Sequence, residues 1–339
     1  MKSRISLASI VLFFILAPVA GLFATPVNVG IYIPGVTAGS PLYQSLVDAA
    51  QKVANELPEV SIKVLEGGFN QAEWPEKVTS MVATSQYDYI LTSNPSMPSI
   101  CLEASKSFPN QRFIIMDSYL APGNTRFYTL LYNQVEQGYI AGYLAGLVTT
   151  SGMSGANSAK KIGAIVAQEY PALSREIIPG FSKGAQAIDS KINIDYRVIG
   201  NWYDANKASD LANSMIDGGV DVILSIAGGA SQGIIKAAQA RGKYVICFDS
   251  DVYSIAPGTI IGCVTLDQGR AVYESLKKAI QGKLAFGTAD FVSVKDGFVD
   301  LADANPIYSK NVSADVRLKM AEMMKKFRSG GFSLPIPQM

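Results

Sequence analysis

Short apolar strand patterns alternate with amphipathic helical patterns from residue 27 onward, and this alternation constrains the fold more than any other feature. A β-branched run at residues 27–33 ends at Pro34-Gly35, and residues 42–57 follow with helical spacing. Strands that alternate with helices predict βαβ units around a parallel sheet. The nearly continuous apolar character of runs such as residues 113–116 fits a sheet that helices cover on both faces.

The pattern starts again near residue 160, after a Ser-, Gly- and Thr-rich segment at residues 149–159 that is typical of a loop. We therefore expect an α/β protein with two Rossmann-like lobes, each with a parallel sheet, joined by a hinge. The expected N-terminal lobe comprises residues 25–133 and 266–287, and the C-terminal lobe residues 134–265 and 288–330. Ligands bind beyond the carboxyl ends of strands in such sheets, so we expect a ligand cleft between the lobes.

The first residues are typical of a secretory signal rather than of the fold. Lys2 and Arg4 precede an apolar run that extends to Phe23, which predicts a signal peptide over residues 1–24. An uncleaved membrane anchor stays open as an alternative, because the run is near the lower limit of about 20 apolar residues for a span. We expect a periplasmic or cell-surface protein, exported by this signal, with membrane anchoring left open.

Composition argues against several functions. The net charge is +1, so nucleic acid is not an expected partner, and the chain has no histidine, the commonest catalytic base and metal ligand. Cys101, Cys247 and Cys263 lack CxxC spacing, so they predict buried apolar positions rather than a metal site. We expect neither catalysis nor a cofactor. An exported α/β enzyme that processes a nucleoside or sugar remains the alternative of another class, since aspartates follow several strands.

Several motifs together carry a resemblance to a known family: QGYIAGYLAG at residues 137–146, PALSREIIPGFSKG at 171–184, GNWYDANKASDL at 200–211, GVDVILSIAGGASQG at 219–233 and FDSD at 248–251. With them the chain resembles the basic-membrane-protein (Bmp, PnrA-like) substrate-binding lipoproteins of ABC importers, over nearly all of residues 27–300. The resemblance implies the type I periplasmic binding fold and a non-catalytic receptor that delivers its ligand to an ABC permease and ATPase. We expect a monomer. A ligand-sensing domain is a third possibility, which the lack of a DNA-binding segment before the first lobe disfavours.

The resemblance also implies a site for a small aromatic ligand. Members of the family hold a purine nucleoside between aromatic side chains of the two lobes, with acidic and basic residues at the ribose. By position, Trp202 matches a stacking residue, and three aspartates match the acidic sites: Asp117, Asp249 and Asp251. The carboxylates can accept hydrogen bonds from hydroxyls, although turn or capping chemistry would equally explain one of the last two.

Two departures from the family pattern bear on the ligand. Leu42 occupies the position of the stacking Phe, with Tyr43 beside it as either a second stacking ring or a packing residue. The lysine that contacts the sugar is absent from residues 264–267, and the family's lipobox cysteine is also missing. These loops resemble a spirochaetal branch that binds riboflavin. Riboflavin is therefore the expected ligand, with a purine nucleoside as the alternative.

Further candidates lie after other strands of the two series: Asn94, Arg175, Asp204, Gly228, Asp267 and Gln268. Arg175 could bind a ligand or pair with Glu169 or Glu176. The pair Gly228-Gly229 could bring backbone N–H groups to a ligand or simply make a tight turn. The residues at 267 and 268 could line the cleft or form part of the hinge.

Overall fold

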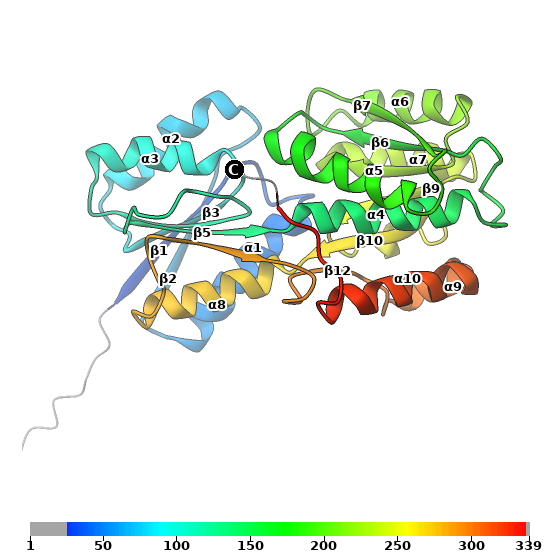
Figure 1. The fold of residues 1–339 in the computed structure, drawn as a ribbon. Coiled ribbons are helices and arrows are strands. Elements are labelled where there is room, and N and C mark those ends of the chain that lie inside the picture. Colours follow the sequence, from blue (N-terminus) through cyan, green and yellow to red (C-terminus); the bar gives the residue numbers. More distant parts are fainter. Residues whose placement is uncertain (1–25, 337–339) are drawn as a thin grey trace, which may run out of the picture.

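The computed structural model describes residues 26–336, which form two lobes, each built around a six-stranded sheet (Figure 1). The expected signal peptide, residues 1–24, lies outside the described residues. Within residues 26–336, no helix has the length and apolar character needed to cross a membrane. The expectation of an α/β fold with two sheets is confirmed.

The first sheet has the strand order β11-β5-β4-β3-β1-β2, and all of its pairings are parallel. Its strands are β1 (Val27–Ile33), β2 (Val60–Glu66), β3 (Tyr89–Ser93), β4 (Arg112–Met116), β5 (Phe127–Tyr132) and β11 (Thr288–Val292). One face is covered by α1 (Pro41–Glu56) and α8 (Gln268–Ile280), and the other by α2 (Trp74–Ala83) and α3 (Met97–Ser107).

The alternation of side chains along β4 shows why this sheet needs helices on both faces. Phe113 and Ile115 lie in the core beneath α2 and α3, whereas Ile114 and Met116 lie in the core beneath α1. Successive strand residues point to opposite faces, so an unbroken apolar run supplies both cores at once.

The second sheet has the order β12-β10-β9-β8-β6-β7, in which only the β10–β12 pairing is antiparallel. Its strands are β6 (Lys161–Val166), β7 (Asn193–Val198), β8 (Val222–Ile226), β9 (Tyr244–Asp249), β10 (Ile260–Leu266) and β12 (Val299–Leu301). Its helices are α4 (Gln134–Thr149), α5 (Ile178–Gln186), α6 (Ala205–Asp217), α7 (Ser231–Ala240), α9 (Pro306–Asn311) and α10 (Ala314–Arg328). A π-helical turn, Leu173–Ile177, leads into α5.

The chain passes between the two sheets three times. It crosses at Asn133, between β5 and α4, at Asp267, between β10 and α8, and at residues 293–298, between β11 and β12. The expected lobe boundary at residue 287 is therefore wrong for residues 288–292, because β11 pairs with β5 in the first sheet. The short β11 is half-exposed, so its sequence lacks the apolar run that marks the other strands.

The three cysteines lie where the sequence predicts them. Cys101 is on α3, Cys247 on β9 and Cys263 on β10, and all three are buried and free. Burial raises the pKa of each thiol, so each remains protonated and packs as a small apolar residue.

Candidate functional site

Three residues at strand ends have unusual backbone angles. Asn94 follows β3 with a φ of 137°, Asp117 follows β4 with 50°, and Asp249 ends β9 with 70°. Such conformations cost non-glycine residues roughly 1–3 kcal/mol each, and they gather at sites where function requires them. The carboxyl ends of the two sheets are therefore the first place to look for a binding site.

The first turn of α4 joins the aspartates of the two lobes. Gln134 donates from Nε2 to Asp117 Oδ1 over 3.2 Å, and Gln137 donates from Nε2 to Asp249 Oδ1 over 2.9 Å. Residues three apart on a helix share a face, so one helical turn holds both carboxyl groups. The Oε1 atom of each glutamine is buried without a partner among the described residues, which leaves an acceptor beside each aspartate.

Burial makes these carboxyl groups unusually weak acids. It raises the pKa of Asp117 to about 7, with the charges of Asp249 and Glu176 adding to the effect. Burial likewise raises the pKa of Asp249 to about 6, opposed by the hydrogen bond from Gln137, and that of Glu176 to about 7. Among the described residues, no lysine or arginine contributes to these shifts. The cluster is acidic and lacks a counter-charge, which suits a ligand that donates hydrogen bonds and carries no negative charge.

Aromatic side chains from both lobes lie near this carboxyl cluster. Tyr43 lies in the first turn of α1, and Tyr170 follows β6 in the second lobe. Burial raises the pKa of both phenols, and the charges of Asp117 and Asp249 raise them further, which shows that both phenols lie near the same carboxyl groups. The half-buried Trp202 lies beside Tyr170, with ring centroids 6.5 Å apart.

The tryptophan is fixed by two neighbours in its own lobe. Its Nε1 donates to Gln168 Oε1 over 2.9 Å. Gly228, with a φ of 53°, lies directly behind the ring, because a β-carbon there would sit 3.3 Å from Trp202 Cε3. The structure thus places Gly228 as a support for the ring. The expectation that Trp202 forms a wall of the ligand site stays a prediction.

Other expected site residues have structural roles in the described chain. Asp204 caps α6 by accepting from the Lys207 N–H over 2.9 Å, and Asp267 caps α8 by accepting from the Arg270 N–H over 3.0 Å. Asp251 is exposed and accepts from Asn305 Nδ2 over 2.8 Å. Turn and capping chemistry therefore accounts for the hydrogen bonds of these three aspartates. Of Asp249 and Asp251, the former, at the end of β9, belongs to the carboxyl cluster.

The remaining candidates lie around the cluster rather than within it. Gln268 is buried, donates to Ser93 Oγ over 2.9 Å and accepts from the Tyr132 hydroxyl over 2.7 Å, so it fastens the second crossing to the first sheet. Leu42 packs against the core, half-buried. Arg175 is exposed on the π-helical turn and forms no ion pair with Glu169 or Glu176 among the described residues.

Sequence reasoning missed five residues that the structure brings to this region: Gln134, Gln137, Gln168, Tyr170 and Glu176. Two of them lie in the first turn of the helix that follows a crossing. Gln134 is only two residues beyond the end of β5, so the strand-end rule could have selected it, whereas Gln137 lies one helical turn further along α4. Within the described part of the chain, no group of three or more acidic, cysteine or histidine residues could hold a metal ion.

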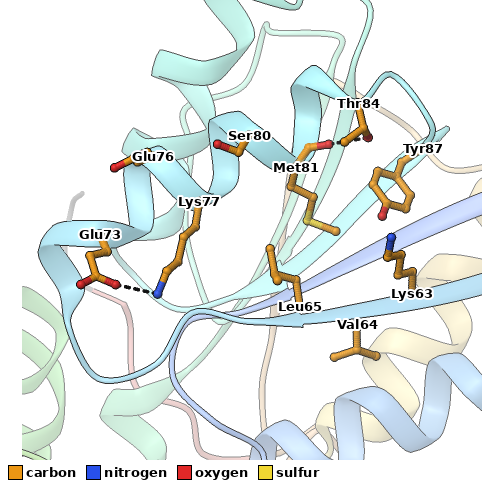
Figure 2. Close-up of a pocket in the computed structure, with 10 residues that line it drawn as sticks. All are labelled: Lys63, Val64, Leu65, Glu73, Glu76, Lys77, Ser80, Met81, Thr84 and Tyr87. Atoms are coloured by element: carbon orange, nitrogen blue, oxygen red, sulfur yellow. Dashed lines mark hydrogen bonds and ion pairs between the residues drawn. The ribbon is translucent and has the colours of Figure 1, made fainter.

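A separate groove of about 560 Å³ lies on the outside of the first lobe, between β2 and α2 (Figure 2). Its lining mixes lysines with glutamates, and Lys77 is already paired with Glu73 at 2.7 Å. None of its lining residues belongs to the carboxyl cluster or its aromatic surround. The groove therefore does not extend the candidate site.

Comparison with known proteins identifies the family. The family model described as Bmp, ABC transporter substrate-binding protein PnrA-like, matches residues 26–330. The chain belongs to this family. The resemblance expected from the motifs is confirmed, and the protein is a substrate-binding protein of the ABC transporter type. The expected kinship with the riboflavin-binding branch stays a prediction.

Similar proteins include two whose names state a ligand. The ABC transporter nucleoside-binding protein BmpA of Lactococcus lactis is 26% identical, covering 68% of this chain and 66% of that protein. A purine-binding protein of Brucella abortus is 24% identical, covering 75% and 67%. The CD4+ T-cell-stimulating antigen of Listeria monocytogenes is 24% identical, covering 78% and 75%.

The fold also has solved counterparts. The crystal structure of an ABC transporter solute-binding protein from Aeropyrum pernix K1 superposes with a TM-score of 0.81 and 20% identity, covering 93% of this chain and 94% of that one. At this identity the likeness shows the fold alone, and it confirms the expected type I periplasmic binding architecture.

Proposed function

We propose that this protein is the extracytoplasmic receptor of an ABC importer and that its interlobe site binds a purine nucleoside. The observation that carries the proposal is the pair Asp117 and Asp249, one from each lobe, held by a single turn of α4. Ribose hydroxyls can donate to both carboxyl groups, so a bound nucleoside would connect the two lobes. The printed names of the relatives from Lactococcus lactis and Brucella abortus support this ligand class.

The aromatic residues supply the other half of the binding chemistry. A purine ring can stack against Trp202, Tyr43 or Tyr170, each contact contributing about 0.5–1.5 kcal/mol beyond area burial. Among residues 26–336, no lysine or arginine contributes to the pKa shifts of the carboxyl cluster, which disfavours a phosphate group. The proposed receptor therefore takes nucleosides in preference to nucleotides.

Riboflavin is the second candidate, and the sequence departures support it. Leu42 replaces a stacking ring, and residues 264–267 lack the lysine that contacts the sugar in the family. Riboflavin is also uncharged, planar and rich in hydroxyl groups, so it satisfies the same carboxyl cluster. The two ligands differ in ring width and can be separated by direct measurement.

Isothermal titration of the purified protein with guanosine, inosine, riboflavin and guanosine monophosphate tests the proposal. We expect micromolar or tighter binding of a purine nucleoside and at least tenfold weaker binding of the monophosphate, which corresponds to about 1.4 kcal/mol. Tighter binding of riboflavin would make the protein a flavin receptor. Binding of neither class would refute the proposed function.

The enzyme alternative is tested on the same samples. Chromatography of the nucleoside after prolonged incubation should show no free base, because a receptor returns its ligand unchanged. Export through residues 1–24 and delivery to a permease belong to the same proposal. Cell fractionation of the full chain and of a variant lacking those residues tests export, and the expected outcome is loss of the extracytoplasmic pool in the variant.

A further inference from the structure

Gln168, just after β6, bonds to both lobes at once. Its Oε1 accepts from Trp202 Nε1 over 2.9 Å within the second lobe and from Gln71 Nε2 over 3.0 Å across the gap to the first lobe. Gln168 Oε1 therefore binds both the Trp202 ring and Gln71 of the opposite lobe. The orientation of the tryptophan and the contact between the lobes depend on this one acceptor.

An aromatic pair lies beside this hydrogen bond. Phe69 of the first lobe and Tyr203 of the second have ring centroids 5.6 Å apart, although both side chains remain more than half exposed. Each ring adjoins a residue of the hydrogen-bonded set, Phe69 two residues before Gln71 and Tyr203 directly after Trp202. The two interlobe contacts therefore form one patch.

The loops that carry this patch are anchored within their own lobes. In the first lobe, Trp74 Nε1 donates to the Gly68 carbonyl over 2.9 Å, and Lys77 Nζ donates to the Gly67 carbonyl over 2.8 Å. Figure 2 shows Lys77 also reaching Glu73, in the helix that follows this loop. In the second lobe, Asn201 Oδ1 accepts from the backbone N–H groups of Tyr203, over 3.1 Å, and of Asp204, over 2.7 Å.

We propose that Gln168 is a positioning residue that couples the Trp202 ring to lobe closure, and that Gln71, Phe69 and Tyr203 complete an interlobe latch. Because each loop is anchored to its own lobe, only side-chain contacts across the gap must break when the lobes separate. A ligand between the lobes leaves only after that separation, so the latch slows release more than it affects capture. The effect on ligand release rests on the proposed function.

The first test measures dissociation of guanosine, or of riboflavin if that is the ligand bound, by stopped flow. Gln71→Ala should raise the dissociation rate about 2- to 10-fold, the range for loss of one neutral hydrogen bond, with little change in association. Gln168→Ala should raise it at least as much, because this variant also loses the hydrogen bond from Trp202. Their double variant should fall short of the product of the single effects, since both remove the same interlobe bond. Gln168→Glu, which keeps the acceptor, should restore slow release.

Gln51→Ala is the matched control, because within the described part of the chain its side chain hydrogen-bonds only to Asn55 on the same helix, over 3.2 Å. Its dissociation rate should equal that of the wild type. Equal rates in Gln71→Ala and Gln168→Ala as well would overturn the latch. The latch would also be overturned if Gln51→Ala released the ligand as fast as these two variants.

A second test needs no ligand. The native cysteines are buried, so spin labels can be attached selectively at Glu103→Cys on α3 and Asn206→Cys on α6, both exposed positions in different lobes. Gln71→Ala and Gln168→Ala should shift the distance distribution toward longer separations, whereas Gln51→Ala should not. An unchanged distribution overturns the latch. Failure of every nucleoside and of riboflavin to bind would refute the proposed function, while this distance measurement would still decide the latch.

Discussion

Replacement of Trp202 tests whether its ring contacts the ligand or only packs within the protein. We predict that Trp202→Ala weakens nucleoside binding by about 2- to 13-fold, the equivalent of the 0.5–1.5 kcal/mol of a stacked pair, and more where apolar area is lost as well. Trp202→Phe should retain most of the affinity because it keeps a ring. Isothermal titration measures both.

The control for this prediction is Phe113→Leu. Phe113 is buried in the core beneath α2 and α3, so its replacement should alter thermal stability but leave the dissociation constant unchanged. Unaltered binding by Trp202→Ala would place the ligand elsewhere in the molecule.

We expect the Asp249 carboxyl group to lower the stability of the protein at high pH and to contribute to nucleoside binding. Its folded pKa of about 6 lies above the ordinary aspartate value, so its ionisation at higher pH opposes folding. We predict that Asp249→Asn raises the free energy of unfolding at pH 8 by on the order of 1 kcal/mol, with no gain at pH 4, while it weakens nucleoside binding. Urea denaturation at both pH values measures the first effect. Asp251→Asn, at an exposed turn, is the control and should change neither.

For single residues, the sequence could predict which ones lie at strand ends but not which of them come together in one site. Asp117 and Asp249 follow apolar strands, and the rule that ligands bind beyond strand ends finds both. The same rule also selects Asp204 and Asp267, which are helix caps, because a strand end and a helix start adjoin in every βα unit. Tyr170, four residues after β6, was not among the expected site residues, and only the three-dimensional arrangement shows its nearness to the two carboxyl groups.

The packing of α4 against α5 explains the glycine-rich motif near residue 140. A β-carbon on Gly142 would overlap the carbonyl group of Phe181, and one on Gly184 would overlap that of Tyr139. We predict that Gly142→Ala lowers the free energy of unfolding by about 1–3 kcal/mol, the usual cost of overpacking, because backbone rather than a flexible side chain fills the space. Gly152→Ala, at a position with no neighbour within 4 Å, is the matched control. Equal stability of the two variants in urea denaturation would contradict this account.

Apolar periodicity identified most of the elements but missed those that contribute little to a core. The strand at Val27–Ile33 lies at the expected residues, and the helix at Pro41–Glu56 is offset by one residue from the expected 42–57. In contrast, β11 is half-exposed and β12 has only three residues, so neither produces a recognisable run. These two elements carry the third crossing, which is why the lobe boundary near residue 287 was misplaced.

At the scale of the whole molecule, we expect lobe closure to depend on pH, because the carboxyl cluster contains groups from both lobes. The pKa values of Asp117 and Glu176 are raised to about 7 and that of Asp249 to about 6. A raised folded pKa contributes stability that is present below the ordinary carboxyl range, near pH 4, and that is lost as the pH rises through 6–7. The ligand-free protein should therefore lose stability from pH 5 to pH 8, relative to an Asp117→Asn/Asp249→Asn double variant.

Ligand binding should have the opposite dependence on pH. Hydroxyl donors favour ionised carboxylates, so nucleoside affinity should rise over the same interval in which the empty protein loses stability. Calorimetric melting of the wild type and the double variant at pH 5 and pH 8, with and without nucleoside, measures both effects together. The stabilisation by ligand should be larger at pH 8 in the wild type and should depend less on pH in the double variant, in which Glu176 is the remaining carboxyl group of the cluster. A wild-type stabilisation that is greatest at pH 5 would mean that the ligand binds the protonated cluster, with the carboxyl groups as hydrogen-bond donors.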